Sequence, residues 1–67
     1  MADQEDYNLK RGKHMEGIAD QHYSIKEFAK AARLYKDAFN NFKKGADKDS
    51  CLRIKEKFEK CKEKLKE

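Results

Sequence analysis

A wide apolar face on the segment between residues 25 and 44 limits the folds open to this chain. At about 100° per residue of an α-helix, the apolar side chains cover an arc of roughly 160°; they are Phe28, Ala31, Ala32, Leu34, Tyr35, Ala38, Phe39 and Phe42, with Ala46 just past the end of the segment. A face this wide indicates contact with two neighbouring helices. The chain has 67 residues, 45% of them charged, and no proline, and its lysines, glutamates and alanines favour helix. We therefore predict an all-α fold, a three-helix antiparallel bundle with this helix in the middle.

The start of the middle helix is predicted from a capping box at Ser24 to Glu27. In this motif the serine hydroxyl accepts from the N–H of Glu27, and the Glu27 carboxylate accepts from the N–H of Ser24. Tyr23 and Phe28 flank the box as a hydrophobic staple. We expect the first helix to end just before Ser24, and the short connection makes the first two helices antiparallel.

The end of the middle helix is predicted at Lys44, because Gly45 can adopt the left-handed conformation common at helix C-termini. Asp47, Asp49 or Ser50 would then cap a third helix that runs to the last residues. The apolar side chains of this third helix fall within roughly 80°, which predicts a narrow buried seam; they are Cys51, Ile54, Phe58, Cys61 and Leu65.

The first helix has the weakest pattern. Asp3 or Asp6 would cap it, while Gly12 and Gly17 weaken it by roughly 1 kcal/mol each relative to alanine. The side chains and glycines that it offers to the core are Leu9, Gly12, Met15, Ile18, Ala19 and His22.

No set of residues in the chain has the spacing of a known catalytic motif or phosphate-binding loop, so we do not expect an enzyme or a cofactor. Cys51 and Cys61 lie about 15 Å apart along one helix, too far for a disulfide. A zinc site would need His14 and His22 from another helix, and we favour small apolar cysteines in a reduced protein instead.

Charge and targeting signals bear on the partner and the compartment. Residues 24–46 carry six basic and two acidic side chains, but the third helix alternates signs, whereas nucleic-acid binding favours a one-sided basic face. A basic module that binds nucleic acid or an anionic membrane is therefore the alternative function.

The acidic N-terminus does not resemble a signal peptide, and no apolar run approaches the ~20 residues of a membrane span. We expect a cytoplasmic chain.

An acidic ridge on the third helix is the candidate binding site. Leu52, Glu56, Glu59 and Glu63 cluster within roughly 60° on a helical wheel, beside the predicted seam. Glu59 and Glu63 are like charges four residues apart, which is unfavourable unless a cation is supplied from outside. An arginine-bearing helix of a partner would supply one.

The second and third segments together resemble a known family. Residues 28–42, FAKAARLYKDAFNNF, resemble the second helix of MIT (microtubule-interacting and trafficking) domains, with an aromatic, paired alanines, Leu-Tyr and a second aromatic in that order. Residues 52–66, LRIKEKFEKCKEKLK, resemble the closing helix of the family. Gly12, Met15 and Ala19 match small and apolar positions of its first helix.

The resemblance implies a single MIT-like domain over residues 1–67, which we expect at the N-terminus of a larger protein such as an AAA ATPase. It implies a monomeric module that binds C-terminal tails of ESCRT-III subunits in endosomal sorting, with recruitment to endosomal membranes. A helical leucine/arginine motif would lie between the second and third helices, its arginines paired with Glu63, Glu59 and Glu56. An extended proline-containing motif would lie between the first and third helices. The family's exposed leucine in this region is replaced by a charged residue, which we take to be Glu59.

A tetratricopeptide-type hairpin with a third helix added is the nearest alternative in shape. Ala31, Tyr35 and Ala38 would be its small–aromatic–small positions. Lys26 stands where its turn glycine is expected, however, and its closing proline is absent. We therefore favour the MIT-like interpretation.

Overall fold

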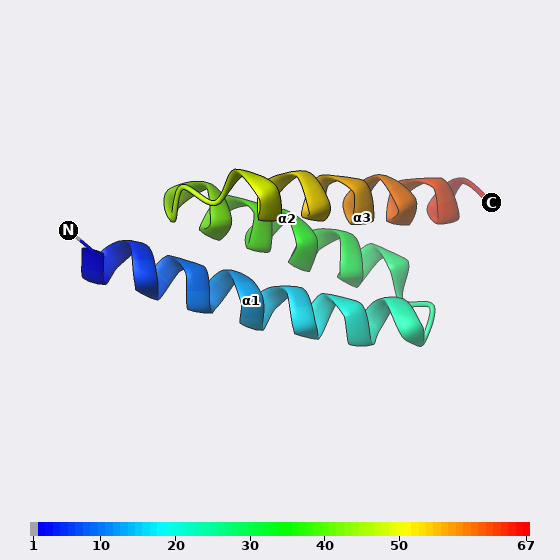
Figure 1. The fold of residues 1–67 in the computed structure, drawn as a ribbon. Helices are drawn as coiled ribbons and strands as arrows, with labels where there is room; N and C mark the ends of the chain where they lie inside the picture. Colours follow the sequence, from blue (N-terminus) through cyan, green and yellow to red (C-terminus); the bar gives the residue numbers. More distant parts are fainter. Residues whose placement is uncertain (1) are drawn as a thin grey trace.

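A computed structural model describes residues 2–67 as three α-helices in an up-and-down arrangement (Figure 1). They are α1 (Ala2–Ser24), α2 (Phe28–Lys44) and α3 (Lys48–Lys66). Short turns join consecutive helices, so α2 runs antiparallel to both α1 and α3 (Figure 1). The molecule is a rod with principal extents of 43 × 17 × 13 Å. The predicted all-α three-helix fold is confirmed.

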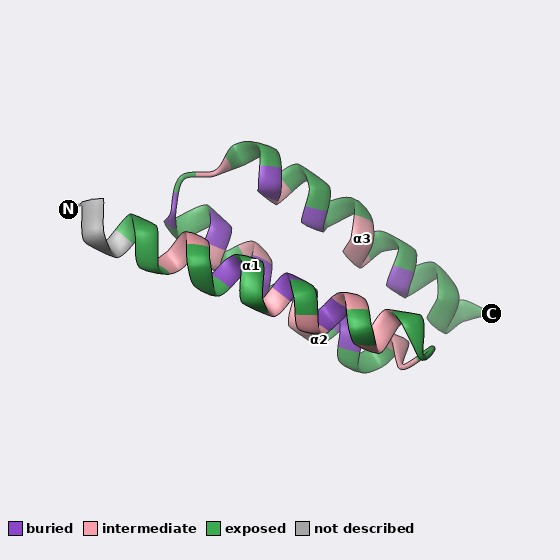
Figure 2. Cartoon of the chain, turned by 60° about the horizontal axis from the view of Figure 1, so that its bottom comes forward, coloured by how far each residue is buried: buried purple, intermediate pink, exposed green. Residues whose placement is uncertain are grey.

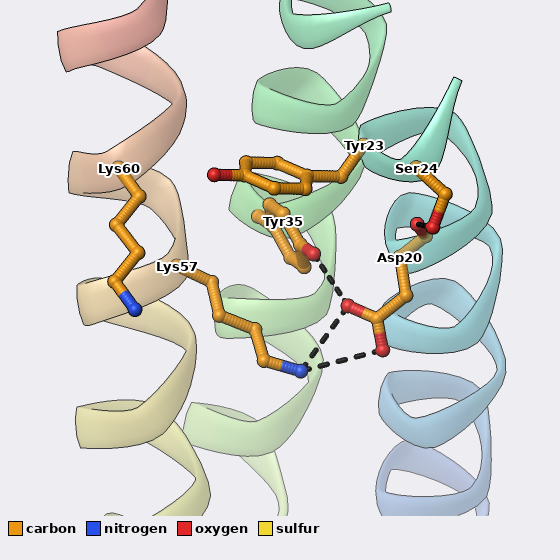
Figure 3. Close-up of a pocket in the computed structure, with 6 residues that line it drawn as sticks. All are labelled: Asp20, Tyr23, Ser24, Tyr35, Lys57 and Lys60. Atoms are coloured by element: carbon orange, nitrogen blue, oxygen red, sulfur yellow. Dashed lines mark hydrogen bonds and ion pairs between the residues drawn. The ribbon is translucent and has the colours of Figure 1, made fainter. Parts of the chain in front are cut away.

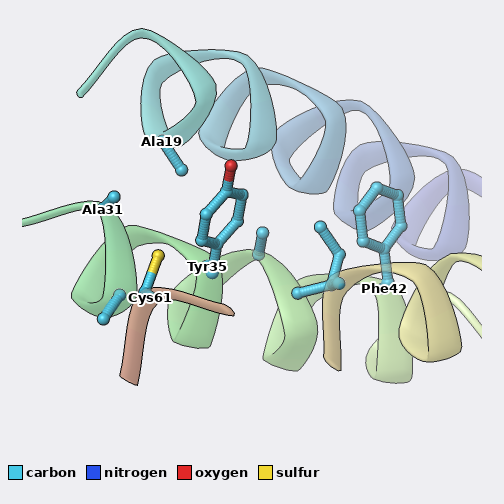
Figure 4. Packing of buried hydrophobic residues seen from close by; sticks show 8 residues of the cluster. Ala19, Ala31, Tyr35, Phe42 and Cys61 are labelled. Carbon is cyan, nitrogen blue, oxygen red and sulfur yellow. The ribbon is translucent and has the colours of Figure 1, made fainter. Parts of the chain in front are cut away.

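The core lies on α2, as its wide apolar face predicts. Four of its side chains, Ala31, Tyr35, Ala38 and Phe42, are at most 2% exposed. Tyr35 and Phe42 project from α2 toward α1 (Figure 4). Helix α3 contributes a single stripe of buried side chains, and most of its remaining surface is exposed (Figure 2). Contacts between α1 and α2 and between α2 and α3 therefore build the fold, with α2 as the shared member.

Gly12 allows α1 and α2 to approach closely. A Cβ atom at this position would lie 3.0 Å from two ring carbons of Phe42, closer than ordinary van der Waals contact. Gly12 therefore has a packing role, whereas a Cβ at Gly17 would meet nothing within 4 Å. Helix α1 begins at Ala2, so Asp3 and Asp6 lie within it and the prediction that one of them is its N-cap is wrong.

The predicted capping box is wrong. Helix α1 continues through Ser24, whose hydroxyl donates to the carbonyl of Asp20 at 3.0 Å. Helix α2 begins at Phe28, and Glu27 at its N-cap makes no side-chain capping bond. The aromatic contact of the predicted staple does form: the rings of Tyr23 and Phe28 meet edge-to-face at 5.1 Å.

The Glu27 carboxylate has a different partner from the one predicted. Its Oε1 lies 2.7 Å from Nδ1 of His22, in a hydrogen bond that spans the α1–α2 turn. Lys26 completes this turn with a positive φ of 66°. Ser24 and Glu27 each have another hydrogen-bond partner nearby, in the Asp20 carbonyl and the His22 imidazole. These local hydrogen bonds compete with the capping box and replace it.

The α2–α3 turn confirms one prediction and corrects another. Helix α2 ends at Lys44 as predicted, but Gly45 has a φ of −83°, and Ala46 is the residue with a positive φ, 59°. Gly45 is needed for space instead, because a Cβ there would lie 2.7 Å from the side chain of Leu9. Asp47 is the N-cap of α3, since its carboxylate accepts from the N–H of Ser50 at 3.1 Å.

Within residues 2–67, no helix combines the length and the apolar character that crossing a bilayer requires.

Candidate functional site

The four predicted site residues are all exposed on α3, and Leu52 is 64% exposed. At about 100° per residue, Glu56 and Glu63 lie about 160° to 180° from the fully buried Ile54. Leu52 and Glu59 lie closer to α2, and both line hollows between α2 and α3. The ridge therefore faces solvent, on the side of α3 opposite to the buried seam of that helix. Only Leu52 and Glu59, at one edge of the ridge, reach the junction with α2.

A groove follows this junction between α2 and α3. It consists of two hollows of about 430 and 490 Å³ that share Phe39 and Lys55 and so form one continuous depression. Phe39 of α2 and Phe58 of α3 are half-buried along it, and Leu52 stands near the α2–α3 turn. We call this depression the α2/α3 groove. Its apolar strip is accessible from solvent along one side of the molecule.

Lysines border the groove on both helices. Lys36 and Lys43 lie along the α2 side, and Lys48 and Lys55 lie along the α3 side. All four are exposed. The groove thus combines an apolar floor with cationic edges, an arrangement that suits an amphipathic ligand.

A cluster of polar and charged side chains connects α3 to α1, on the side of α3 that faces away from the α2/α3 groove. The Arg53 guanidinium donates from Nε and an Nη nitrogen to the two carboxylate oxygens of Glu16, at 2.9 and 2.8 Å. Lys57 Nζ donates to Glu16 at 2.8 Å and to Asp20 at 3.1 Å. The Tyr35 hydroxyl donates to the same Asp20 carboxylate (Figure 3). We call these five side chains the polar bridge.

The pKa values of the polar bridge favour fixed protonation states. The Arg53 hydrogen bonds lower the pKa of Glu16 to about 2, against an opposing effect of burial and with help from Lys57. Burial and the hydrogen bond to Asp20 raise the pKa of Tyr35 well above its usual value. Burial acts to lower the pKa of Lys57, but hydrogen bonds to Glu16 and Asp20 outweigh it and raise the pKa. Because Glu16 and Lys57 keep their charges and Tyr35 keeps its proton near neutral pH, these three groups hold the helices together and are not poised for proton transfer.

The cysteines and histidines form no metal site in the part of the chain that the structure describes. Cys51 is half-buried and Cys61 is buried, and both are free thiols. Burial raises the pKa of each, which keeps the sulfur protonated and unreactive at neutral pH.

Several residues of these two surfaces were not predicted as site residues. Phe39 and Phe58 belong to the predicted apolar faces, but the structure leaves both half-buried beside the α2/α3 groove. The polar bridge joins Glu16 to Arg53 across 37 positions. The sequence does hold a signal for it. The acids at positions 16 and 20 are four residues apart, and so are the cations at positions 53 and 57. Two acids on one helix can therefore face two cations on another at the same spacing.

Comparisons of the chain with models of known protein families, with curated proteins and with solved structures find no match in any of the three.

Proposed function

We propose that this chain is a protein-interaction module that binds a short helical segment of a partner protein in the α2/α3 groove. The observation that carries the proposal is the apolar strip of Phe39, Phe58 and Leu52 along two antiparallel helices. A partner helix can lay its apolar face into such a groove, with anchor side chains at spacings of three, four and seven residues. On binding, the strip would gain the apolar contacts that it lacks in the isolated chain.

The resemblance to MIT domains supports a partner class for this groove. It points to the C-terminal tails of ESCRT-III subunits, and hence to a role in endosomal sorting at the cytoplasmic side of membranes. The pairing of partner arginines with Glu56, Glu59 and Glu63 stays a prediction of that resemblance. Of these three, only Glu59 lines the groove, where Lys36, Lys43, Lys48 and Lys55 outnumber it.

The polar bridge weighs against the alternative binding mode between α1 and α3. An extended motif there would have to displace or avoid the ion pairs of Glu16 with Arg53 and Lys57, at 2.8 Å each. The Glu16 side chain is only 12% exposed, so removing its partners would leave a buried charge uncompensated, which is costly. No comparable ion pair joins α2 to α3 among the residues that the structure describes, so the α2/α3 groove is open by comparison.

The direct test is a titration of the isotope-labelled chain with the tails of an ESCRT-III set, read from amide chemical shifts. We expect shifts at Phe39, Leu52 and Phe58 with at least one tail. Leu52→Glu should abolish them, because it puts a charge on the apolar strip. Ile25→Glu is the matched control, since Ile25 is 66% exposed against 64% for Leu52 but lies in the α1–α2 turn. Shifts confined to α1 and α3, or none with any tail, would contradict the proposal.

A further inference from the structure

We propose that the helix bound in the α2/α3 groove carries acidic side chains on both flanks of its apolar face, spaced one heptad apart. This inference rests on the proposed function, because it describes the partner of the same groove. It differs from the arginine-bearing helix expected from the acidic ridge. The carrying observation is the arrangement of Lys36, Lys43, Lys48 and Lys55 around the apolar strip.

The four lysines stand in two facing pairs. Lys36 and Lys55 border one hollow, and Lys43 and Lys48 border the other, which Lys55 also reaches. Along each helix the two lysines are seven residues apart, which is about 10 Å or two helical turns. A helix lying between α2 and α3 therefore meets two cations on each side at the same repeat. The matching pattern is acids at the flanking positions of successive heptads, as in coiled coils.

None of these four ammonium groups forms an ion pair within residues 5–67. Other lysines of the chain are engaged, such as Lys57 with Glu16 at 2.8 Å. The four lysines bordering the groove are thus cationic edges free to pair with a ligand. Bringing an arginine-bearing helix between them would place like charges together, which disfavours that partner.

The acids that line the groove do not cancel this charge. Asp47 is occupied at the N-cap of α3, where its carboxylate accepts from the N–H and hydroxyl of Ser50 at 3.1 and 2.7 Å. Glu59 has Lys62 Nζ at 4.0 Å, and Lys62 itself lies over the Phe58 ring at 5.6 Å from the centroid. Asp47 and Glu59 keep their negative charges, but the four lysines outnumber them, so the lining of the groove carries a net charge of about +2.

The apolar floor distinguishes a protein helix from a polyanion. A nucleic-acid strand or an anionic membrane would satisfy the lysines through phosphates alone. Bases can stack on exposed aromatic rings and acyl chains can take up apolar side chains, but neither repeats in register with the seven-residue spacing of the lysines along the strip at Phe39 and Leu52. An acidic amphipathic helix matches both the floor and the edges, which is why we favour it.

The test uses two designed peptides of about 14 residues, long enough for two heptads. Both carry the same leucines on one face; one has glutamates at the flanking positions and the other has arginines there. We expect the glutamate peptide to bind at least about tenfold more tightly at about 50 mM salt, because several exposed ion pairs add together. The preference should shrink at about 500 mM salt, where exposed charges are screened.

Charge reversal at the groove supplies the matched variants. Lys36→Glu with Lys55→Glu should remove or reverse the preference. Lys10→Glu with Lys60→Glu changes the net charge equally at exposed positions outside the groove, and should leave the preference intact. Circular dichroism of both variants checks that the helices are retained.

The outcomes separate this inference from the proposed function. Equal binding of the two peptides, or tighter binding of the arginine peptide, at Phe39 and Leu52 would overturn the acidic-partner inference and leave the groove as a binding site. Absence of shifts at the groove with either peptide, and with every tail tested above, would overturn both. A single-stranded oligonucleotide or an anionic vesicle that binds Lys36 and Lys55 more tightly than the glutamate peptide, with no effect of Leu52→Glu, would assign the lysines to a polyanion and overturn the inference.

Discussion

Replacing Glu16 by glutamine tests how much the polar bridge contributes to stability. The Glu16 carboxylate is only 12% exposed and accepts from both Arg53 and Lys57. Its pKa falls from 4.5 to about 2 in the folded chain, which at about 1.4 kcal/mol per pKa unit corresponds to about 3.5 kcal/mol. The side chains of Arg53 and Lys57 are 47% and 32% exposed, so solvent screening reduces this to about 2 kcal/mol.

The pH dependence follows from the sign of this shift. Because the folded pKa is depressed, the contribution of Glu16 is fully present above the unfolded pKa of about 4.5 and is lost as the pH falls through the folded value of about 2. Glu16→Gln should therefore lower the free energy of unfolding by about 2 kcal/mol at pH 7. The difference from the wild type should shrink steadily between pH 5 and pH 2.

The assay is urea unfolding followed by far-ultraviolet circular dichroism at several pH values. A chain of this length has a total stability of roughly 3 to 10 kcal/mol, so the variant retains a folded population at pH 7. Glu59→Gln is the control, because Glu59 is 53% exposed and its Lys62 partner is 4.0 Å away; its effect should stay within about 0.5 kcal/mol. A loss below about 0.5 kcal/mol for Glu16→Gln, or the same loss at pH 3 as at pH 7, would refute the assigned role of the bridge.

Three further predictions concern the backbone and the core, each measured as a change in the free energy of unfolding in urea. Gly17→Ala should stabilise the chain by up to about 1 kcal/mol, because a Cβ meets nothing there, whereas Gly12→Ala should destabilise it through the contact with Phe42; effects of the same sign would contradict this. Ala46→Gly should stabilise the α2–α3 turn by about 0.5 to 1 kcal/mol, since the residue has a φ of 59°, and a loss would show that the turn does not need that conformation. Ile54→Val should cost about 1 kcal/mol because Ile54 is fully buried; no change would place it outside the core.

The periodicity of the apolar residues carries most of the information about the fold. The arc on α2 predicts its central place, and the narrow stripe on α3 predicts that this helix is mainly exposed, because burial follows directly from which face each side chain occupies. The end of α2 at Lys44 is also predicted, and the α3 cap at Asp47 is one of the three candidates that the sequence offers. The backbone conformation of the turns is harder to predict from the sequence. Lys26 and Ala46 have the positive φ values, although local propensity favours glycine for that conformation.

The candidate site is predicted less well than the fold, for a physical reason. Periodicity assigns Phe39 and Phe58 to the apolar faces, but their half-buried position depends on how α2 and α3 pack against each other, which no single helix determines. The polar bridge similarly depends on the register of α1 against α3, which places Glu16 opposite Arg53. Glu56 and Glu63 were predicted beside the seam, whereas they face solvent on the other side of α3.

Helix α3 has two attachments that respond differently to the solution. Its apolar seam at Ile54 and Cys61 is insensitive to ionic strength, while its ion pairs to Glu16 weaken as salt screens them. Helices α1 and α2 pack against each other more extensively than α2 and α3 do, so we expect the partial unfolding of lowest free energy to release α3 alone and to expose its amides to hydrogen exchange. The α2/α3 groove exists only while α3 is docked on α2. Salt that weakens the ion pairs between α3 and α1 therefore also lowers the population of chains in which the groove is formed.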